Sequence, residues 1–138
     1  MSETHFTDRN YFSIRKYRTR HTQHPDATAH GGIAVIISER IPHFEMDKYE
    51  EDYLQATSIK IKDSSGSLTI AAIYCPLRQS VKKEQFKKFF DSLQNRFIAG
   101  GDYNAKDPQW GSRLINPKGR KLHKTLSRRR HTVISAPV

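Results

Sequence analysis

The chain has 138 residues, 36% of them hydrophobic, which is enough for one domain with a small core and too little for two. Lysine and arginine number 24 against 14 acidic residues; the net charge of +10 favours a polyanionic partner such as nucleic acid, although a generally basic soluble surface gives the same charge. With one cysteine, no run of about 20 apolar residues and no apolar N-terminal signal, we expect an intracellular protein that is not secreted and has neither a disulfide nor a membrane span.

Before residue 55 the sequence predicts one clear strand between polar connections. Residues 3–20 indicate a loop that leads to a short extended segment, and residues 18–30 indicate an exposed loop or hairpin tip around a proline. Residues 31–38, GGIAVIIS, form a short, continuous, β-branched run that is typical of a buried strand. Residues 40–53 indicate a charged connection.

Residues 55–75 predict an antiparallel hairpin. Residues 55–62 alternate between polar and apolar side chains, and residues 68–75 form a second apolar run that Pro76 closes. The residues between the two runs, DSSGS, contain a glycine and suit a hairpin turn.

Two helices are predicted in the second half of the chain. Residues 81–93 carry an apolar stripe at i, i+3, i+4 and i+7, and Ser80 is the expected cap. The stripe, which we expect to pack in the core, consists of Phe86, Phe89, Phe90 and Leu93. Asn116 as cap and Pro117 in the first turn predict a second helix to about residue 129, and residues 131–135 resemble a further strand.

The most informative stretch is an apolar run that two glycines end. Residues 97–99 predict a buried strand, and Gly100, Gly101, Asp102 and Asn104 follow. If the extended path continues, the carboxylate and the amide point to one face, where a carboxylate can activate a water and an amide can hold a substrate oxygen. The glycines permit close approach of a ligand or of another backbone. An ordinary Asp/Asn turn is the alternative explanation.

Several motifs in a fixed order resemble the endonuclease/exonuclease/phosphatase superfamily: Glu3-Thr4, residues 72–76 (AIYCP) and residues 101–105 (GDYNA). The segments HGGIAVII, QATSIKI, GGDYNAKDPQWGSRLINPKGR and TVISAPV are most similar to the apurinic-endonuclease-like endonuclease domain of jockey-type non-LTR retrotransposons, and the resemblance covers nearly the whole chain. It implies an α/β (α+β) fold, the central part of a two-sheet α/β sandwich of DNase I-like type with mostly antiparallel strands and flanking helices.

The resemblance also implies metal-dependent hydrolysis of a DNA phosphodiester, with Mg²⁺ or alternatively Mn²⁺ as the cofactor. Glu3 stands where the family has a metal-binding carboxylate, and Tyr74 matches the tyrosine whose hydroxyl contacts the scissile phosphate. Asp102 matches the residue that positions or activates the attacking water, and Asn104 matches the amide that holds the phosphate. An exposed N-terminal residue and a half-buried surface aromatic are the alternative explanations of Glu3 and Tyr74.

Three residues beyond the aspartate are expected to contact DNA phosphates or, equally, to be solvated loop residues: Arg113, Asn116 and Lys118. In retroelements of this kind the nick in chromosomal DNA primes reverse transcription. The resemblance therefore implies DNA as the partner, a fused reverse transcriptase in the parent element and a nuclear location.

The sequence departs from the family pattern at both ends. That pattern has a strand ending in asparagine before the Glu-Thr motif, and an aspartate and a Ser-Asp-His motif after TVISAPV. We therefore expect residues 1–138 to be a partial domain whose hydrolysis is lost or very weak. The rival function is a non-catalytic, basic nucleic-acid-binding remnant, which a test for metal-dependent nicking distinguishes. A small-molecule phosphatase of the same superfamily fits the positive charge less well.

Overall fold

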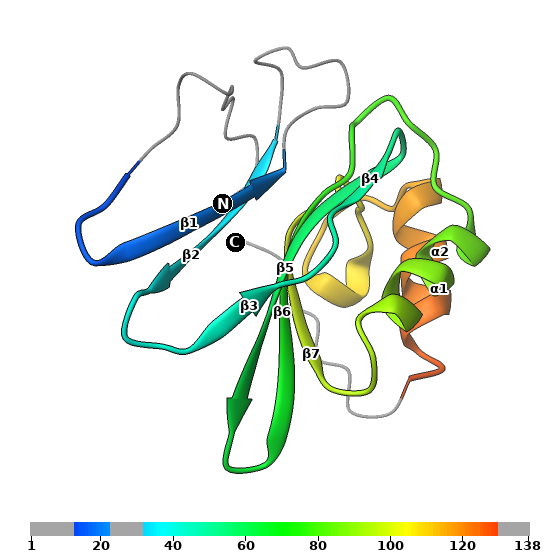
Figure 1. The fold of residues 1–138 in the computed structure, drawn as a ribbon. Coiled ribbons are helices and arrows are strands. Elements are labelled where there is room, and N and C mark those ends of the chain that lie inside the picture. The colour runs from blue at the N-terminus through cyan, green and yellow to red at the C-terminus, as the bar shows by residue number, and fades with distance from the viewer. Residues whose placement is uncertain (1–12, 23–31, 130–138) are drawn as a thin grey trace.

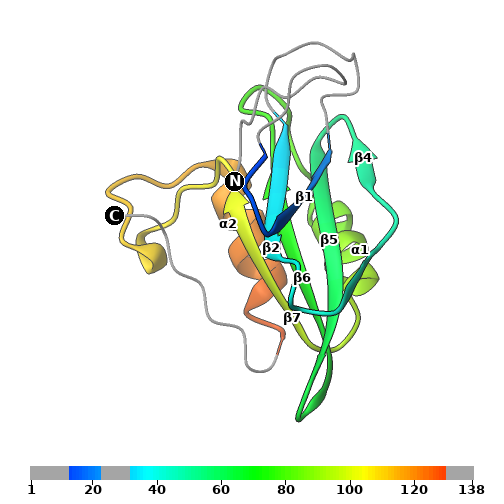
Figure 2. The ribbon, with the colours of Figure 1, turned by 60° about the vertical axis from the view of Figure 1, so that its left-hand side comes forward.

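The computed structural model describes residues 13–22 and 32–129, which form three layers (Figure 1). A small sheet of two strands lies on one side of a larger sheet, and the two α-helices cover the other side (Figure 2). Glu3 and the strand expected over residues 131–135 lie outside the described residues. The arrangement confirms the predicted class, a mixed α/β fold with two sheets and flanking helices.

The strands pair in a simple order. The small sheet consists of β1 (Tyr17–Thr22) and β2 (Ile33–Ser38), which are antiparallel. The larger sheet has the order β3 (His43–Glu45), β5 (Leu54–Asp63), β6 (Gly66–Tyr74) and β7 (Phe97–Asp102), and β4 (Tyr49–Glu51) also pairs with β5. Only β6 and β7 are parallel among these described pairs, with α1 (Lys83–Ser92) in the connection between them. The 3₁₀-helix η1 (Pro108–Trp110) and α2 (Pro117–Leu126) follow β7.

The hairpin predicted over residues 55–75 is confirmed. Strands β5 and β6 pair from Gln55 opposite Tyr74 to Asp63 opposite Gly66. The Arg96 guanidinium, just before β7, binds the Asp63 carboxylate in a bidentate pair, with N–O distances of 2.7 and 2.6 Å. The turn of the hairpin is therefore tied to the start of the strand that carries the glycine-aspartate motif.

Two predictions about the first half of the chain were incomplete. The short extended segment predicted before residue 20 is β1, but this strand continues to Thr22, into the predicted loop or hairpin tip, and the connection over residues 40–53 contains β3 and β4. Strand β1 carries polar residues, but it pairs with the apolar β2, and its last side chain, Thr22, is fully buried with its hydroxyl 2.5 Å from that of Thr57. Strands β3 and β4 have three residues each, too few for a periodic pattern to indicate them.

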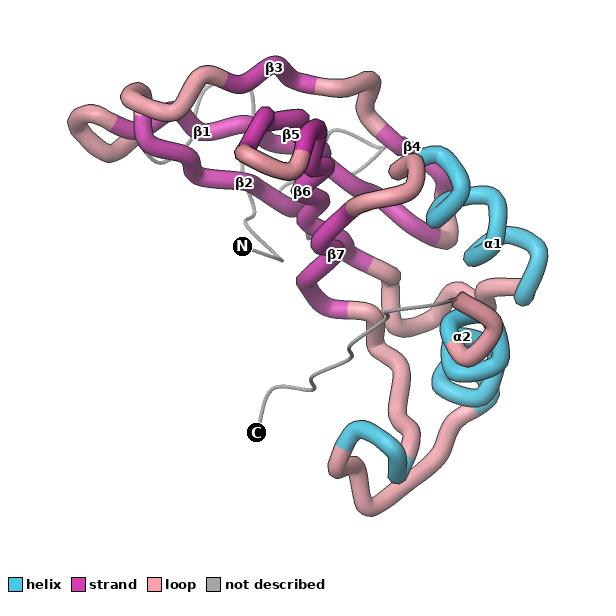
Figure 3. The backbone as a smooth tube through the Cα atoms, turned by 90° about the horizontal axis from the view of Figure 1, so that it is seen from below, coloured by secondary structure: helices cyan, strands magenta, loops and turns pink. Residues whose placement is uncertain are grey.

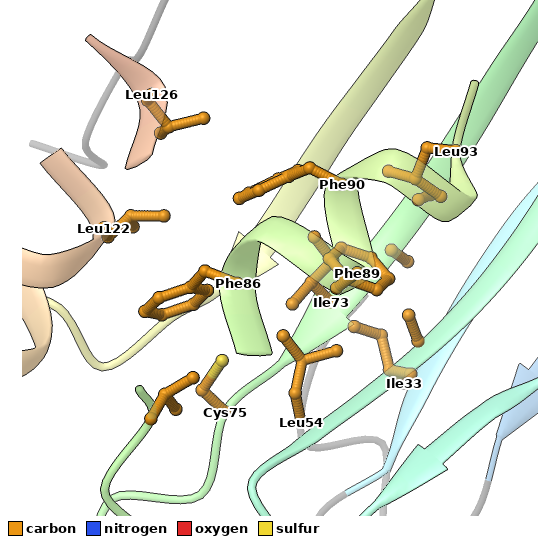
Figure 4. Close-up of a cluster of buried hydrophobic side chains, with 14 residues drawn as sticks. Ile33, Leu54, Ile73, Cys75, Phe86, Phe89, Phe90, Leu93, Leu122 and Leu126 are labelled. Atoms are coloured by element: carbon orange, nitrogen blue, oxygen red, sulfur yellow. The ribbon is translucent and has the colours of Figure 1, made fainter. Parts of the chain in front are cut away.

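Most of the buried hydrophobic cluster lies between the larger sheet and the helices, and Ile33 of the small sheet also belongs to it (Figure 4). The predicted aromatic stripe of α1 is buried against the sheet, and the ring of Phe90 stacks on that of Phe97 in β7 at 5.7 Å between centroids. Leu122 and Leu126 of α2 complete the same cluster. Because burying each phenylalanine stabilises the fold by about 2–3 kcal/mol, these contacts fix both helices on the sheet.

The helix caps were predicted with mixed success. Ser80 does not cap α1; the N-cap is Lys82, whose backbone N–H donates to the Gln85 side-chain oxygen at 2.7 Å. This capping interaction places the helix start at Lys83, two residues later than predicted. Asn116 caps α2 as predicted, although the helix ends at Leu126 and not near residue 129.

Candidate active site

The predicted site residues of the two parallel strands lie side by side. Tyr74 and Asp102 are register partners at the ends of β6 and β7, so both side chains point to the same face of the sheet. The preceding residue of β6, Ile73, is fully buried in the core on the helix side. Tyr74 and Asp102 therefore face the opposite side, where the small sheet lies, and both are half-buried.

Asp102 and Asn104 are joined by a tight turn. The Asn104 backbone N–H donates to Asp102 Oδ1 at 2.8 Å, and Asn104 has a left-handed backbone with φ of 47°. The assumption that the extended path continues past Asp102 was therefore wrong. The Asp/Asn turn that was the alternative explanation is present, and it holds the amide beside the carboxylate, because asparagine tolerates this conformation better than most residues.

Hydrogen bonds tie the tips of β6 and β7 together. The Asn104 amide donates from Nδ2 to the Cys75 carbonyl oxygen at 2.9 Å, and the Cys75 backbone N–H donates to the Asp102 carbonyl oxygen at 2.8 Å. Cys75 is fully buried, and this burial raises the pKa of its thiol to about 12. Backbone groups of Cys75 thus hold the Asn104 side-chain amide and the main chain of Asp102, while the Asp102 carboxylate is held by the Asn104 N–H.

The two glycines of the motif have different roles. Gly101 has φ of 145°, and a Cβ atom there would overlap the Ile73 carbonyl oxygen and lie 2.8 Å from the Ile73 nitrogen. A Cβ atom at Gly100 would meet no atom within 4 Å. The sequence analysis expected the glycines to permit close approach of either a ligand or another backbone. At Gly101 the group that approaches closely is the backbone of Ile73.

The Asn116 side chain binds backbone groups of the loop that follows Asp102. Its Oδ1 accepts hydrogen bonds from the Gly119 and Lys106 backbone N–H groups at 2.7 and 3.0 Å, and its Nδ2 donates to the Asn104 carbonyl oxygen at 3.0 Å. The side chain that caps α2 thus also holds the backbone of Asn104. A phosphate contact by Asn116 stays a prediction, and the structure gives this amide three protein partners.

Lys118 is buried at 7% exposure, whereas Arg113 is exposed. The Lys118 ammonium donates to the Pro76 carbonyl oxygen at 2.8 Å, just after β6. Burial lowers the pKa of Lys118, and the nearby Cys75 and Asp102 oppose that shift. Among the three predicted DNA contacts, only Arg113 has an exposed side chain. Arg113 belongs to the loop that contains η1, and this loop extends beyond the end of β7 (Figure 3).

Sequence reasoning missed a pair that fixes this loop. Asp107 is buried, caps η1 by accepting the Gln109 N–H at 3.0 Å, and lies 3.2 Å from Nδ1 of His123 in α2. The half-buried Trp110 ring lies 6.3 Å from the His123 ring, measured between centroids. The Asp-Pro sequence at the start of η1 is a capping signal that indicates this role.

The oxygen atoms at the strand tip suit a hard divalent cation. One oxygen of the Asp102 carboxylate and the Asn104 Oδ1 atom have no hydrogen-bond partner among residues 13–22 and 32–129. Mg²⁺ is commonly held by one or two protein oxygens together with water and substrate phosphate, which fits this donor set. Within the same described ranges no group of three or more His, Cys, Asp or Glu side chains gathers, and Glu3 lies outside them.

The fold is that of a DNase I-like endonuclease domain. The structure is similar to the endonuclease domain of TRAS1, a telomere-specific non-LTR retrotransposon, with a TM-score of 0.63 and 22% identity over 83% of this chain and 53% of that one. A family model described as endonuclease-reverse transcriptase matches residues 68–137, half of the chain. The chain therefore belongs to this family, within the endonuclease/exonuclease/phosphatase superfamily.

The sequence relatives agree with the jockey-type resemblance. The RNA-directed DNA polymerase from mobile element jockey of Drosophila melanogaster is 33% identical over 134 residues, 97% of this chain. The jockey protein of Drosophila funebris is 29% identical over 98% of this chain. The chain spans 15% of the length of each of these two relatives. No helix in the described part of the chain is long and apolar enough to cross a membrane.

Proposed function

We propose that this chain binds duplex DNA and hydrolyses a phosphodiester with Mg²⁺, or alternatively Mn²⁺, at the site formed by Tyr74, Asp102 and Asn104. The observation that carries the proposal is the side-by-side placement of the ends of β6 and β7, in a member of an endonuclease family. In the parent element we propose a fused reverse transcriptase, in keeping with the names of the relatives. We also propose that the DNA nicked there is nuclear.

Each of the three side chains has chemistry that suits a phosphate. The open oxygen of the Asp102 carboxylate can accept a hydrogen bond from the attacking water and orient it. The Asn104 Nδ2 atom carries a second hydrogen besides the one donated to Cys75, and this hydrogen can bind a phosphate oxygen. The Tyr74 hydroxyl can donate to the phosphate from the adjacent strand. The Asp102 and Asn104 oxygens, with Glu3 as a further proposed ligand, would hold a magnesium ion, which would polarise the phosphate as a Lewis acid.

The positive charge supports DNA as the polyanion. With a net charge of +10, binding is expected to weaken steeply with salt, because each neutralised phosphate releases counterions. Arg113 is an exposed cation on the loop that follows the site, and its replacement by glutamine should reduce the slope of log Kd against log salt by about 1.

Conversion of supercoiled plasmid to nicked circles tests the proposal. We expect nicking with Mg²⁺, none with EDTA, and a loss of at least about 100-fold in Asp102→Asn. Asp47→Asn is the matched control, because it removes an exposed carboxylate on the segment between β3 and β4 and should nick like the wild type. Nicking that persists in Asp102→Asn contradicts the assigned site.

The family resemblance predicts instead that hydrolysis by residues 1–138 is lost or very weak, and the same assay decides between that outcome and the nicking proposed above. Salt-sensitive DNA binding without nicking, at enzyme concentrations well above that of the plasmid, supports the non-catalytic binding module. In that case the Asp102→Asn variant should bind DNA at least as well as the wild type, because a negative charge near the phosphate has been removed.

A further inference from the structure

We propose that Gln55 is a positioning residue of this site, acting through Tyr74, and the proposal rests on the nuclease function above. Gln55 in β5 is the register partner of Tyr74 in β6, which in turn is the partner of Asp102 in β7. Register partners in a sheet point to the same face, with Cβ atoms of direct antiparallel neighbours about 5 Å apart. The amide, the phenol and the carboxylate therefore form one row across three strands, on the face opposite the helices.

The state of the Gln55 side chain is unusual for a buried amide. It is 0% exposed, and neither its Nε2 nor its Oε1 atom has a hydrogen-bond partner among the residues that the structure describes. Buried polar side chains are nearly always hydrogen-bonded, and an unsatisfied one destabilises the folded protein by about 1–3 kcal/mol. An apolar residue at position 55 would leave no buried amide unsatisfied, so it would suit the folded protein better for stability alone.

The chemistry of the row suggests what the amide does. A tyrosine hydroxyl that donates its proton to a phosphate oxygen still has lone pairs that accept. An N–H donated from Gln55 Nε2 to the Tyr74 oxygen would hold the phenol in one orientation and strengthen its hydrogen bond to the phosphate, since bonds in series reinforce one another. Gln55 thus completes its hydrogen bonding when DNA is bound, and Tyr74 is the group that contacts the phosphate.

The test combines stability with a double-mutant cycle. Gln55→Met keeps an unbranched side chain of similar length and removes both polar atoms. We expect the thermal midpoint of the unliganded 138-residue chain to rise by roughly 3–6 °C, because an unsatisfied amide is lost. We also expect kcat/KM for plasmid nicking to fall about tenfold in Gln55→Met. In a Tyr74→Phe background the same change should have no further effect, since the hydroxyl on which it acts is already gone.

Three results overturn the inference: unchanged nicking in Gln55→Met, an equal loss in the wild-type and Tyr74→Phe backgrounds, or a fall in the thermal midpoint, which would mean that the amide is paired in the folded protein. A wild type that binds DNA but does not nick it contradicts the proposed hydrolysis. The Kd for a duplex oligonucleotide with Mg²⁺ is then measured for the same four proteins, the wild type, the two single variants and the double variant. Coupling of Gln55 to Tyr74 in that Kd still supports the inference, and its absence contradicts it. If the wild type does not bind DNA at all, both proposals fall together.

Discussion

Replacing the second glycine of the motif should disrupt the fold, whereas replacing the first should not. A Cβ atom at Gly101 would overlap the Ile73 carbonyl oxygen and lie 2.9 Å from the carbonyl carbon, against 3.4 Å or more for ordinary contact. Relief requires β7 to move away from β6 at the point where the Cys75 N–H donates to Asp102 at 2.8 Å. Gly100 has open space around it and is the matched control.

The cost of Gly101→Ala has two parts. A non-glycine residue at φ of 145° is strained by about 1–3 kcal/mol, and each strand hydrogen bond weakened by the movement costs about 1 kcal/mol. With the one bond named above, the sum of about 2–4 kcal/mol is a large part of the 5–15 kcal/mol that stabilises a typical domain. For Gly100→Ala we expect a change between about 1 kcal/mol of stabilisation and 0.5 kcal/mol of destabilisation, since alanine restricts the unfolded chain.

Urea unfolding measures the difference. The chain has one tryptophan, Trp110 on η1, so its fluorescence reports on the loop that follows β7, and far-UV circular dichroism reports on the whole fold. A Gly101→Ala protein within about 0.5 kcal/mol of the wild type, or a Gly100→Ala protein that is equally destabilised, refutes the close-approach argument. A Gly101→Ala chain that cannot be obtained folded, beside a folded Gly100→Ala chain, agrees with it.

Three further predictions follow from contacts around the site. Asn116→Ala should lower the free energy of unfolding by about 2–3 kcal/mol, because it removes the cap and two other hydrogen bonds, whereas Asn116→Asp keeps the cap and should lose less; equal losses in urea unfolding contradict the capping role. The buried Cys75 thiol, its pKa raised to about 12 by burial, should not react with a disulfide reagent at pH 8 until the chain is unfolded; rapid reaction of the native chain contradicts this. The Arg96 hydrogen bonds lower the pKa of Asp63 from 3.8 to about 2. The contribution of this pair to the free energy of unfolding should therefore be fully present above pH 4 and be lost as the pH falls from 4 to 2. In Arg96→Gln, this part of the acid dependence should be absent from the unfolding curves.

The sequence predicted those parts of the fold that depend on local pattern. The stripe of α1, the β5–β6 hairpin and the Asn116 cap each follow from residues close together in the chain, and all three are present. Strands β3 and β4 were missed, and the extent of β1 was not predicted, because their pairing partners, not their own residues, make them strands. A strand of three residues, such as β3 or β4, forms because it pairs with a longer strand, here β5.

The site was predictable as far as the family motif extends. The motif indicated Tyr74, Asp102 and Asn104, and the parallel register brings the strand ends that carry them together. It gave no sign that Lys118 is buried against Pro76, since the lysine follows a loop and a proline in an otherwise polar segment. Gln55 was equally hidden, because its place in the row depends on a pairing of strands that no spacing along the chain reveals.

The residues expected to contact DNA divide into two groups once their partners are known. Asn104, Asn116 and Lys118 each donate a hydrogen bond to a backbone carbonyl oxygen near the ends of β6 and β7, those of Cys75, Asn104 and Pro76. Each such hydrogen bond stabilises the fold by about 1 kcal/mol, so these side chains help to hold the strand tips together whether or not DNA is present. Loss of nicking on replacing Asn116 or Lys118 would therefore say little about phosphate binding unless stability and salt dependence are measured too. The exposed Arg113 is not among the side chains that hold these strand tips, and the salt slope of DNA binding distinguishes the two groups.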